Sequence, residues 1–283
     1  MLSFYLSLKK SAYYAFPVIL TMSSFLFNGL AHAQNKADVR EVPALKSIFD
    51  QYGVKGTILI SDPVKNELLG FNPSRWDSGY LPASTFKIVN SLIGLETGVI
   101  DTATIFTWDG KKRRISAWDR DLTLTGAFRV SCVPCYQELA RKIGVERMKN
   151  WVGKLQYGHM LITQQTLDLF WLEGDSRITP REQVNFLRRL YEERLPLSSK
   201  VMKQVKSIMV DEKTEKYTIS GKTGWSIRNG NNYGWFVGYL ETNGRVYFVA
   251  TLIEPIFQEQ ISDFSMARKT ITKEAFKMLG LIP

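Results

Sequence analysis

The chain has 283 residues, of which 45% are hydrophobic and 23% are charged. This composition is typical of a globular protein with one large domain or two small ones, and it excludes a mainly disordered, collagenous or coiled-coil chain. The net charge of +10 suits a nucleic acid, a membrane surface or a small anion, and selects none of them. Because the chain has only two histidines, a zinc site built on several of them is excluded.

The N-terminus predicts an export signal. Lys9 and Lys10 form a positive segment, an apolar stretch covers residues 12–30, and Ala31-His32-Ala33 matches the small-x-small pattern of a signal-peptidase site. We expect cleavage after Ala33, which leaves residues 34–283 as a single domain. The alternative is an uncleaved anchor, because the apolar stretch is close to membrane-spanning length. The proline, asparagine and glycine within the stretch weaken that alternative.

The first part of the body passes from strands to helices. Two short apolar runs, Thr57–Ser61 and Glu67–Phe71, flank a polar turn and predict a β-hairpin. From Pro82 the apolar residues recur at helical spacing as far as a predicted C-cap at Gly98. Further helices are predicted at about 134–143, 145–155, 180–193 and 198–210.

The last part of the chain returns to strands and ends with a helix. Strands are predicted at Tyr217–Thr223, Tyr233–Leu240 and Arg245–Ile253, with a strong hairpin signal at Asn243-Gly244. An amphipathic helix is predicted from about Ser262 to Leu279. The simplest architecture is α+β: an antiparallel sheet made from both ends of the chain, packed by the terminal helices, with a helical insertion between them.

The two cysteines, Cys132 and Cys135, lie three residues apart. Three interpretations are open: a redox pair, two ligands of a zinc site completed by His159, or two small buried apolar side chains. The redox interpretation lacks a thioredoxin-like βαβ context, and the zinc interpretation lacks an obvious fourth ligand. Two buried side chains are therefore favoured, and the sequence leaves open whether they are bonded.

Three short motifs follow one another along the chain: Ser84-Thr85-Phe86-Lys87, Ser131-Cys132-Val133 and Lys222-Thr223-Gly224. The first is common by chance, as Ser7-Leu8-Lys9-Lys10 in the export signal shows, whereas Lys-Thr-Gly is rare. Ser84 and Ser131 each open a predicted helix, and Lys222 lies on a predicted strand. This arrangement is typical of enzymes that use a Ser-x-x-Lys motif.

The Ser-x-x-Lys spacing has a chemical reason. Residues i and i+3 share one face of a helix, so Lys87 can reach the hydroxyl of Ser84. Ser84 lies in the first turn, where free backbone N–H groups favour developing negative charge. A serine needs a base to become a nucleophile, and Lys87 is the candidate if apolar burial promotes the loss of its proton. The residues that could bury it are Phe86, Val133, Trp171 and Leu172.

With these motifs, the chain resembles the class D, or oxacillinase-type, serine β-lactamases over about residues 40–283. Class A enzymes pair Ser-x-x-Lys with Ser-Asp-Asn, which is absent here, and Ser131-Cys132-Val133 in its place favours class D. Further stretches fit the family pattern: Trp108-Asp109-Gly110, Ile115-Ser116-Ala117-Trp118, residues 133–138, Phe170-Trp171-Leu172, Glu182-Gln183, Lys222-Thr223-Gly224-Trp225 and Arg268-Lys269. The resemblance implies the β-lactamase and penicillin-binding transpeptidase fold, an antiparallel sheet flanked by helices with a helical subdomain.

The resemblance also implies roles for individual residues. Ser84 is acylated by the substrate, and Lys87, modified by CO2 to N6-carboxylysine, is the general base for acylation and deacylation. Ser131 relays a proton to the leaving nitrogen, and Lys222 contributes positive charge. The backbone N–H groups of Ser84 and Trp225 form an oxyanion hole. The other implied site residues are Phe86, Val133, Trp171 and Leu172 around the carbamate, and Thr223, Gly224, Trp225, Arg268 and Trp118 around the substrate.

For the molecule as a whole, the resemblance implies an antibiotic-resistance enzyme that hydrolyses β-lactams such as penicillins and oxacillin. It implies no metal and no dissociable cofactor, the only added group being CO2 on Lys87. We expect a periplasmic monomer or homodimer that binds neither nucleic acid nor, after signal cleavage, a membrane. The basic run Lys111-Lys112-Arg113-Arg114 is accordingly interpreted as a solvated loop.

One departure and two alternatives accompany this interpretation. The family usually carries Tyr-Gly-Asn where this chain has Tyr157-Gly158-His159, and we expect a local structural role for His159. The alternative functions are the β-lactam sensor domain of a transmembrane receptor and a D,D-peptidase that acts on cell-wall peptides.

Overall fold

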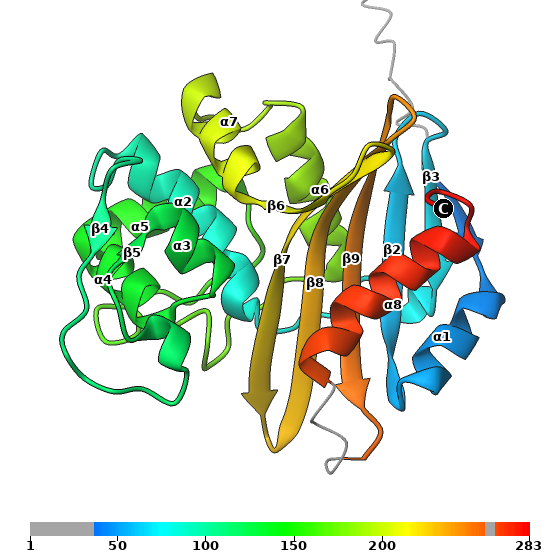
Figure 1. Cartoon of the computed structure of the whole chain (residues 1–283), viewed down its shortest axis with the longest axis horizontal. Coiled ribbons are helices and arrows are strands. Elements are labelled where there is room, and N and C mark those ends of the chain that lie inside the picture. The colour runs from blue at the N-terminus through cyan, green and yellow to red at the C-terminus, as the bar shows by residue number, and fades with distance from the viewer. Residues whose placement is uncertain (1–36, 258–263) are drawn as a thin grey trace, which may run out of the picture. The chain divides into compact units, whose positions relative to one another are not determined.

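The computed structural model describes residues 37–257 and 264–283, so the export signal predicted at 1–33 lies outside the described residues. A seven-stranded sheet of order β1-β3-β2-β9-β8-β7-β6 carries helices on both faces (Figure 1). Its strands are β1 (Asp38–Glu41), β2 (Val54–Asp62), β3 (Glu67–Phe71), β6 (Val210–Lys213), β7 (Tyr217–Arg228), β8 (Asn231–Thr242) and β9 (Arg245–Pro255). A separate small sheet pairs β4 (Ile105–Phe106) with β5 (Leu122–Thr123).

The helices lie mostly between the third strand and the sixth. They are α1 (Lys46–Gln51), α2 (Lys87–Glu96), α3 (Leu124–Arg129), α4 (Val133–Ile143), α5 (Val145–Leu155), α6 (Pro180–Tyr191), α7 (Ser199–Ile208) and α8 (Phe264–Met278). Figure 1 shows α1 and α8 together over one face of the sheet, with α2 to α5 beside the end of the sheet that β7 and β6 form. None of the helices in the described ranges is long and apolar enough to cross a membrane.

The sheet is antiparallel except at one edge. The pairs from β3 through β2, β9, β8 and β7 to β6 all run antiparallel, and β2 against β9 joins the two ends of the chain as predicted. β1, however, pairs parallel to β3, with Asp38 opposite Glu67. The predicted antiparallel sheet is therefore confirmed for every other pair, and this edge adds one parallel pair. The four residues of β1 are all exposed, so they carry no alternating apolar pattern that would mark a strand.

The sheet separates two apolar cores, because neighbouring residues of a strand point to opposite faces. Ile58 and Ile60 of β2 pack in the core that includes residues of α1 and α8. Leu59, between them, packs in the larger core with residues of α2 and α4 to α7. The larger core lies on the side of the sheet where the Ser-x-x-Lys turn is found.

The predicted helices are present, with altered ends. α6 begins at Pro180 because Thr179 and Glu182 form a capping box there. α7 ends at Ile208, two residues before the predicted end, since Val210 already pairs with the sheet in β6. α8 spans Phe264–Met278, and its predicted start at Ser262 lies outside the described residues. The short elements α1, α3, β4 and β5 were not predicted, because they span too few residues to show a period.

The two C-terminal hairpins differ in how well their ends were predicted. The β8–β9 turn at Asn243-Gly244 is confirmed, and both residues have positive φ, as a tight two-residue turn requires. β7 and β8 extend past their predicted ends to a second turn at Asn229-Gly230, which also has positive φ at both residues. This extension brings Trp225 and Ile227 onto the strand that borders the site.

Candidate active site

A cleft of about 640 Å³ opens beside β7, and most of the predicted site residues line it. The predicted residues among its lining are Ser84, Ser131, Val133, Thr223, Gly224, Trp225, Arg268 and Trp118. Phe86, Lys87 and Trp171 do not reach it, because all three are fully buried, and Leu172 is half-buried outside it. Lys222 lines a neighbouring cavity of about 330 Å³, to which Thr223 and Arg268 also belong.

The turn that carries Ser84 is tighter than an α-helix. Residues Ala83–Phe86 form a 3-10 turn, and α2 begins only at Lys87, so the predicted helix starts later than Pro82. Ala83 has a φ of +50°, unusual for a residue other than glycine, and its N–H donates to the carbonyl of Trp171 at 2.8 Å. Lys87 Nζ lies 2.8 Å from Ser84 Oγ, the contact expected from the spacing of the motif.

A buried polar network holds this turn from below. Thr85 Oγ1 donates to the carbonyl of Pro82 at 2.7 Å and accepts from Gln183 Nε2 at 2.9 Å. Tyr157 OH donates to Gln183 Oε1 at 3.1 Å. Three segments far apart in the sequence thus fix the backbone next to Ser84.

The same network explains the Tyr157-Gly158-His159 stretch. Gly158 has a φ of +57°, and a Cβ there would lie 2.5 Å from the carbonyl oxygen of Arg177. His159 exchanges two backbone hydrogen bonds with Arg177, at 2.8 and 2.7 Å, and its side chain is exposed. The stretch therefore places the Tyr157 hydroxyl in the network, and His159 takes part in holding the stretch through its backbone alone.

Lys87 is a buried amine in an apolar and cationic setting. Burial, and then the nearby Lys222 ammonium, lower the pKa of Lys87 well below its usual value. Its Nζ lies 5.2 Å from the centre of the Tyr136 ring. The charged form of Lys87 is thereby disfavoured, and a neutral amine is the form that can act as a base or a nucleophile.

Trp171 contributes a donor that the described part of the chain leaves unpaired. Its ring stacks on Phe86, the neighbour of Lys87, with centroids 5.6 Å apart and planes 16° apart. Its Nε1 is buried and has no hydrogen-bond partner among the described residues. A buried N–H without a partner costs free energy, so it marks a place where an acceptor belongs. The residues present therefore fit an acceptor group carried on Lys87.

Ser131 directly precedes the N-cap of α4, in agreement with the prediction that it opens the helix expected at about residue 134. Its φ is +54°, Cys132 is the N-cap, and α4 begins at Val133. A left-handed φ at such a residue costs free energy and is common where a side chain is aimed into a site. The backbone beside it is also held: Trp118 Nε1 donates to the carbonyl of Val130 at 2.9 Å.

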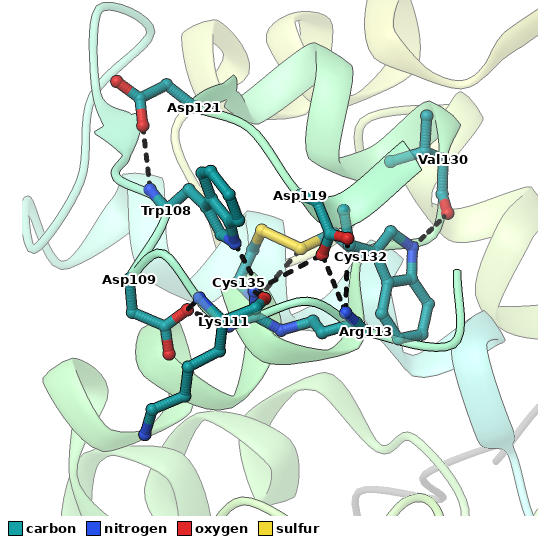
Figure 2. The surroundings of a disulfide bond; sticks show 10 residues. Trp108, Asp109, Lys111, Arg113, Asp119, Asp121, Val130, Cys132 and Cys135 are labelled. Carbon is teal, nitrogen blue, oxygen red and sulfur yellow. Dashed lines mark hydrogen bonds and ion pairs between the residues drawn. A yellow bond between two sulfur atoms is a disulfide. The ribbon is translucent and has the colours of Figure 1, made fainter. Parts of the chain in front are cut away.

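Cys132 and Cys135 form a disulfide across the first turn of α4 (Figure 2). Both are buried, as the favoured interpretation expected, and the structure answers the question that the sequence left open, whether they are bonded. The zinc interpretation is contradicted, because the sulfurs are bonded to each other and no group of three His, Cys, Asp or Glu side chains in the described ranges could hold a metal ion. In the sequence, the bonded pair directly follows Ser131, and Val133 lies between the two cysteines.

On the opposite wall, Gly224 lets β7 approach the Ser84 turn. A Cβ at Gly224 would lie 3.1 Å from the carbonyl oxygen of Pro82, so the close approach depends on a small residue. Arg268, from α8, donates to the carbonyl of Gly224 and lies 5.9 Å from the Trp225 ring. Burial lowers the pKa of Arg268 to about 10, so it stays cationic at neutral pH. Asn232 orients Trp225 by accepting from its Nε1 at 2.7 Å.

Lys222 is the second buried lysine beside the site. Burial, followed by the charges of Arg268 and Lys269, lowers the pKa of Lys222 to about 7. Its Nζ lies 3.3 Å from Thr223 Oγ1 and 5.6 Å from the Phe128 ring. Near neutral pH, Lys222 can therefore hold or release a proton next to Thr223.

Some lining residues were given no role from the sequence: Arg114, Ile115, Val130, Ile227 and Asn232. Ile115 and Ile227 are exposed apolar residues, one in a loop and one near a strand end. In the sequence, each is an apolar residue within a polar stretch, and that is the signal that could have marked them as site residues. The solvated-loop interpretation of the basic run holds for Lys111 and Lys112, which are exposed. It is incomplete for Arg113, which is half-buried in an ion pair, and for Arg114, which lines the cleft.

The fold and the three motifs define a serine enzyme of the penicillin-binding class: the family model for the penicillin binding protein transpeptidase domain matches residues 56–277. The chain is similar to β-lactamase OXA-48 of Klebsiella pneumoniae, with 39% identity over 236 residues, which are 83% of this chain and 87% of that protein. It is also similar to the solved class D β-lactamase YbXI from Nostoc, with 45% identity, a TM-score of 0.80, and coverage of 84% of this chain and 99% of the other. The chain belongs to the class D β-lactamases, a family of serine hydrolases.

A receptor domain shares the fold as well. The C-terminal domain of the Bacillus licheniformis BlaR penicillin-receptor has 27% identity to this chain and a TM-score of 0.80, and covers 87% of this chain and 98% of its own length. The fold therefore accommodates both β-lactamases and a penicillin receptor, and the chemistry of the site has to separate the two.

Proposed function

We propose that this protein hydrolyses β-lactam antibiotics, penicillins and oxacillin among them, through an acyl-enzyme on Ser84, and thereby confers resistance. The observation that carries the proposal is the Lys87 amine: fully buried, with a lowered pKa, and 2.8 Å from the hydroxyl of Ser84. Ser84 itself lies at the wall of the cleft, so a base is held behind a nucleophile that substrate can reach.

In the acylation step, Ser84 Oγ bonds to the lactam carbonyl carbon and the C–N bond of the ring breaks. The serine proton leaves toward Lys87 and returns through Ser131 to the ring nitrogen, so that Lys87 and Ser131 both end the step as they began it. The backbone N–H groups of Ser84 and Trp225 stabilise the negative charge on the carbonyl oxygen, and such preorganised donors contribute several kcal/mol. A water molecule then attacks the ester on Ser84 and releases the opened product.

The role of Lys87 in both steps depends on the group added to it. As N6-carboxylysine, Lys87 presents a carboxylate base for the proton of Ser84 and later for that of the deacylating water. The neutral amine favoured by burial is the form that adds to CO2, with loss of a proton. Phe86, Val133 and Leu172 keep water away, and the unpaired N–H of Trp171 is available to hold the added carboxylate.

Substrate binding uses the β7 wall. Thr223 and Arg268 bind the carboxylate of the antibiotic, since Arg268 is a buried cation held at Gly224. Lys222 contributes positive charge next to Thr223. Gly224, Trp225 and Trp118 complete the walls.

We further propose that residues 1–33 are a signal peptide removed on export, and that residues 34–283 form a single catalytic domain in the periplasm. The motif at Ala31-His32-Ala33 supports this. A monomer or homodimer stays the expectation for its assembly.

The test is steady-state hydrolysis of a chromogenic β-lactam by residues 34–283, with and without bicarbonate, beside Ser84→Ala and Lys87→Ala. We expect turnover that rises with bicarbonate and is lost in both variants. The similarity to the BlaR domain favours a second candidate, a β-lactam sensor that is acylated without turnover. A single stoichiometric burst without turnover, at any bicarbonate concentration, would replace the hydrolase with the sensor.

A further inference from the structure

The basic run at 111–114 places one cation on the wall of the cleft. Arg114 lines the cleft together with Ile115, Trp118 and Ser131. It is exposed and makes no ion pair with the residues that the structure describes. The cleft thus presents a guanidinium that the described residues leave without an ion-pair partner.

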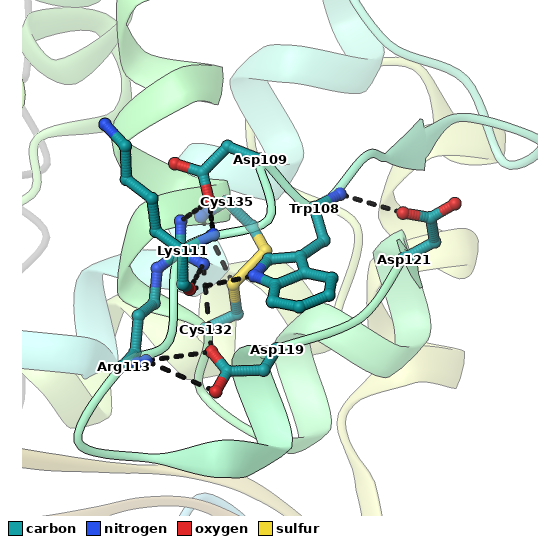
Figure 3. A network of polar contacts seen from close by, with 8 residues as sticks. All are labelled: Trp108, Asp109, Lys111, Arg113, Asp119, Asp121, Cys132 and Cys135. Carbon is teal, nitrogen blue, oxygen red and sulfur yellow. Dashed lines mark hydrogen bonds and ion pairs between the residues drawn. A yellow bond between two sulfur atoms is a disulfide. The ribbon is translucent and has the colours of Figure 1, made fainter.

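The loop that carries Arg114 is tied down by its neighbours (Figure 3). Arg113 donates to Asp109 at 2.8 Å, and its backbone N–H donates to Asp119 at 3.1 Å. Trp108 Nε1 donates to the carbonyl of Lys111 at 2.9 Å, and the backbone N–H of Trp108 donates to Asp121 at 2.8 Å. Three aspartates therefore hold the loop while the guanidinium of Arg114 is left to solvent.

The charges lining the cleft are all of one sign. Its two ionisable lining residues are Arg114 and Arg268, and no carboxylate from the described part of the chain lines it. Arg268, from α8, is buried and anchored to the carbonyl of Gly224, whereas Arg114 is exposed and comes from a different segment of the chain. The exposed apolar side chains of Ile115 and Ile227 line the same cleft. A ligand with an apolar body and two separate anionic groups matches this arrangement.

We propose that Arg114 is a specificity-determining residue that binds a second anionic group, carried on the acylamino side chain of a β-lactam. This inference rests on the proposed function, in which Arg268 takes the carboxylate of the antibiotic. An arginine suits the task, because its planar fork can donate two hydrogen bonds to one carboxylate or sulfonate. The protein would then favour dianionic penicillins over monoanionic ones.

Benzylpenicillin and carbenicillin form a matched pair of ligands, because they differ only in a carboxylate on the acylamino side chain. The dissociation constants of both are measured by calorimetry with Ser84→Ala, which cannot be acylated at Ser84, and then with Arg114→Ala added. The ratio of the two constants removes any general loss of affinity. Lys112→Ala is the control variant: it removes the same charge from the same loop, at an exposed residue outside the cleft lining.

We expect Arg114→Ala to reduce the preference for carbenicillin about fivefold, the upper range for an exposed ion pair. Arg114→Lys should restore part of it, and added salt should shrink the difference. An unchanged ratio in Arg114→Ala, an equal change in Lys112→Ala, or failure of both ligands to bind would overturn the inference. Turnover of benzylpenicillin by the unmodified protein tests the proposed function separately. The preference for carbenicillin is measured by binding alone, so it can be found or refuted even if the protein does not hydrolyse either ligand.

Discussion

Lys222 is a buried ammonium whose charge opposes folding. The pKa of Lys222 is about 7 in the folded chain, against an ordinary value of 10.5. Between these values the unfolded chain binds the extra proton, so the free energy of unfolding rises as pH increases from about 7 to 10.5. The cost of the charge is therefore fully present below pH 7 and disappears above pH 10.5.

Lys222→Met should consequently stabilise the protein at pH 6, by up to about 5 kcal/mol, while reducing its activity. The gain should shrink steadily between pH 7 and pH 10.5, because the folded chain holds Lys222 neutral there and removing the proton that the unfolded chain carries costs less free energy as the pH approaches 10.5. Urea unfolding at pH 6, 8 and 10 measures it. A gain of the same size at every pH would show that Lys222 does not titrate in this window.

A substitution at Trp171 can distinguish the packing role of its ring from the polar role of its N–H. Trp171→Phe keeps a ring that can stack on Phe86 but removes the N–H that has no partner among the described residues. We expect little change in the free energy of unfolding, but about a 10- to 100-fold fall in kcat/KM, the value of a hydrogen bond to a charged group. More bicarbonate should be needed for half-maximal activity. An unchanged bicarbonate requirement would contradict a bond from Trp171 to the group on Lys87.

At the scale of elements, the start of α4 combines a strained backbone with a covalent link. Ser131 has a positive φ, and the disulfide of Cys132 and Cys135 immediately follows it. Figures 2 and 3 both show the disulfide beside Trp108 of the loop that leads to the cleft. Fixing the first turn of α4 therefore also fixes the approach of Ser131 to Ser84.

The double variant Cys132→Ala with Cys135→Ala tests this coupling. The bond closes a short loop, so its removal should cost no more than about 2 kcal/mol of the free energy of unfolding. We expect kcat/KM to fall nonetheless, because Ser131 loses its fixed backbone. Thermal unfolding and steady-state kinetics measure the two effects, and the unmodified protein treated with reductant is the matched control. Full activity in the double variant would remove the disulfide from any positioning role.

At the scale of the whole molecule, the sheet is built from both ends of the chain. β1 pairs with β3, and Leu45, which follows β1, is fully buried in the core shared with α1 and α8. The cleavage proposed after Ala33 leaves both of these intact. Removal of the signal therefore leaves the sheet complete only if the cleavage site lies before β1.

Two truncated chains test this. A protein beginning at Gln34 should unfold at the temperature of the exported protein, and the mass of the exported protein should correspond to that start. A protein beginning at Lys46 loses β1 and Leu45, and should be destabilised by at least about 2 kcal/mol, the value of burying one leucine side chain. Equal unfolding temperatures for the two chains would show that this edge of the sheet contributes nothing.

The sequence alone determined the α+β class, the long helices, the principal hairpins and the Ser84–Lys87 contact. All of these depend on local information: apolar periodicity, the Asn243-Gly244 turn, and the i, i+3 spacing within a turn. The class D resemblance depends on motif order along the chain, and the comparisons confirm it. The parallel edge strand β1 was not predicted, because its four exposed residues show no alternation of apolar and polar side chains.

Only the tertiary structure decided which groups share the cleft and which are buried behind it. The pKa of Lys222 and the unpaired N–H of Trp171 depend on burial and on neighbours from distant segments. Arg114 shows the same limit, because a run of four cations looks uniform in sequence. Folding pairs Arg113 with Asp109 and Asp119 and leaves Arg114 on the cleft wall, since electrostatic partners are set by distance in space and not along the chain.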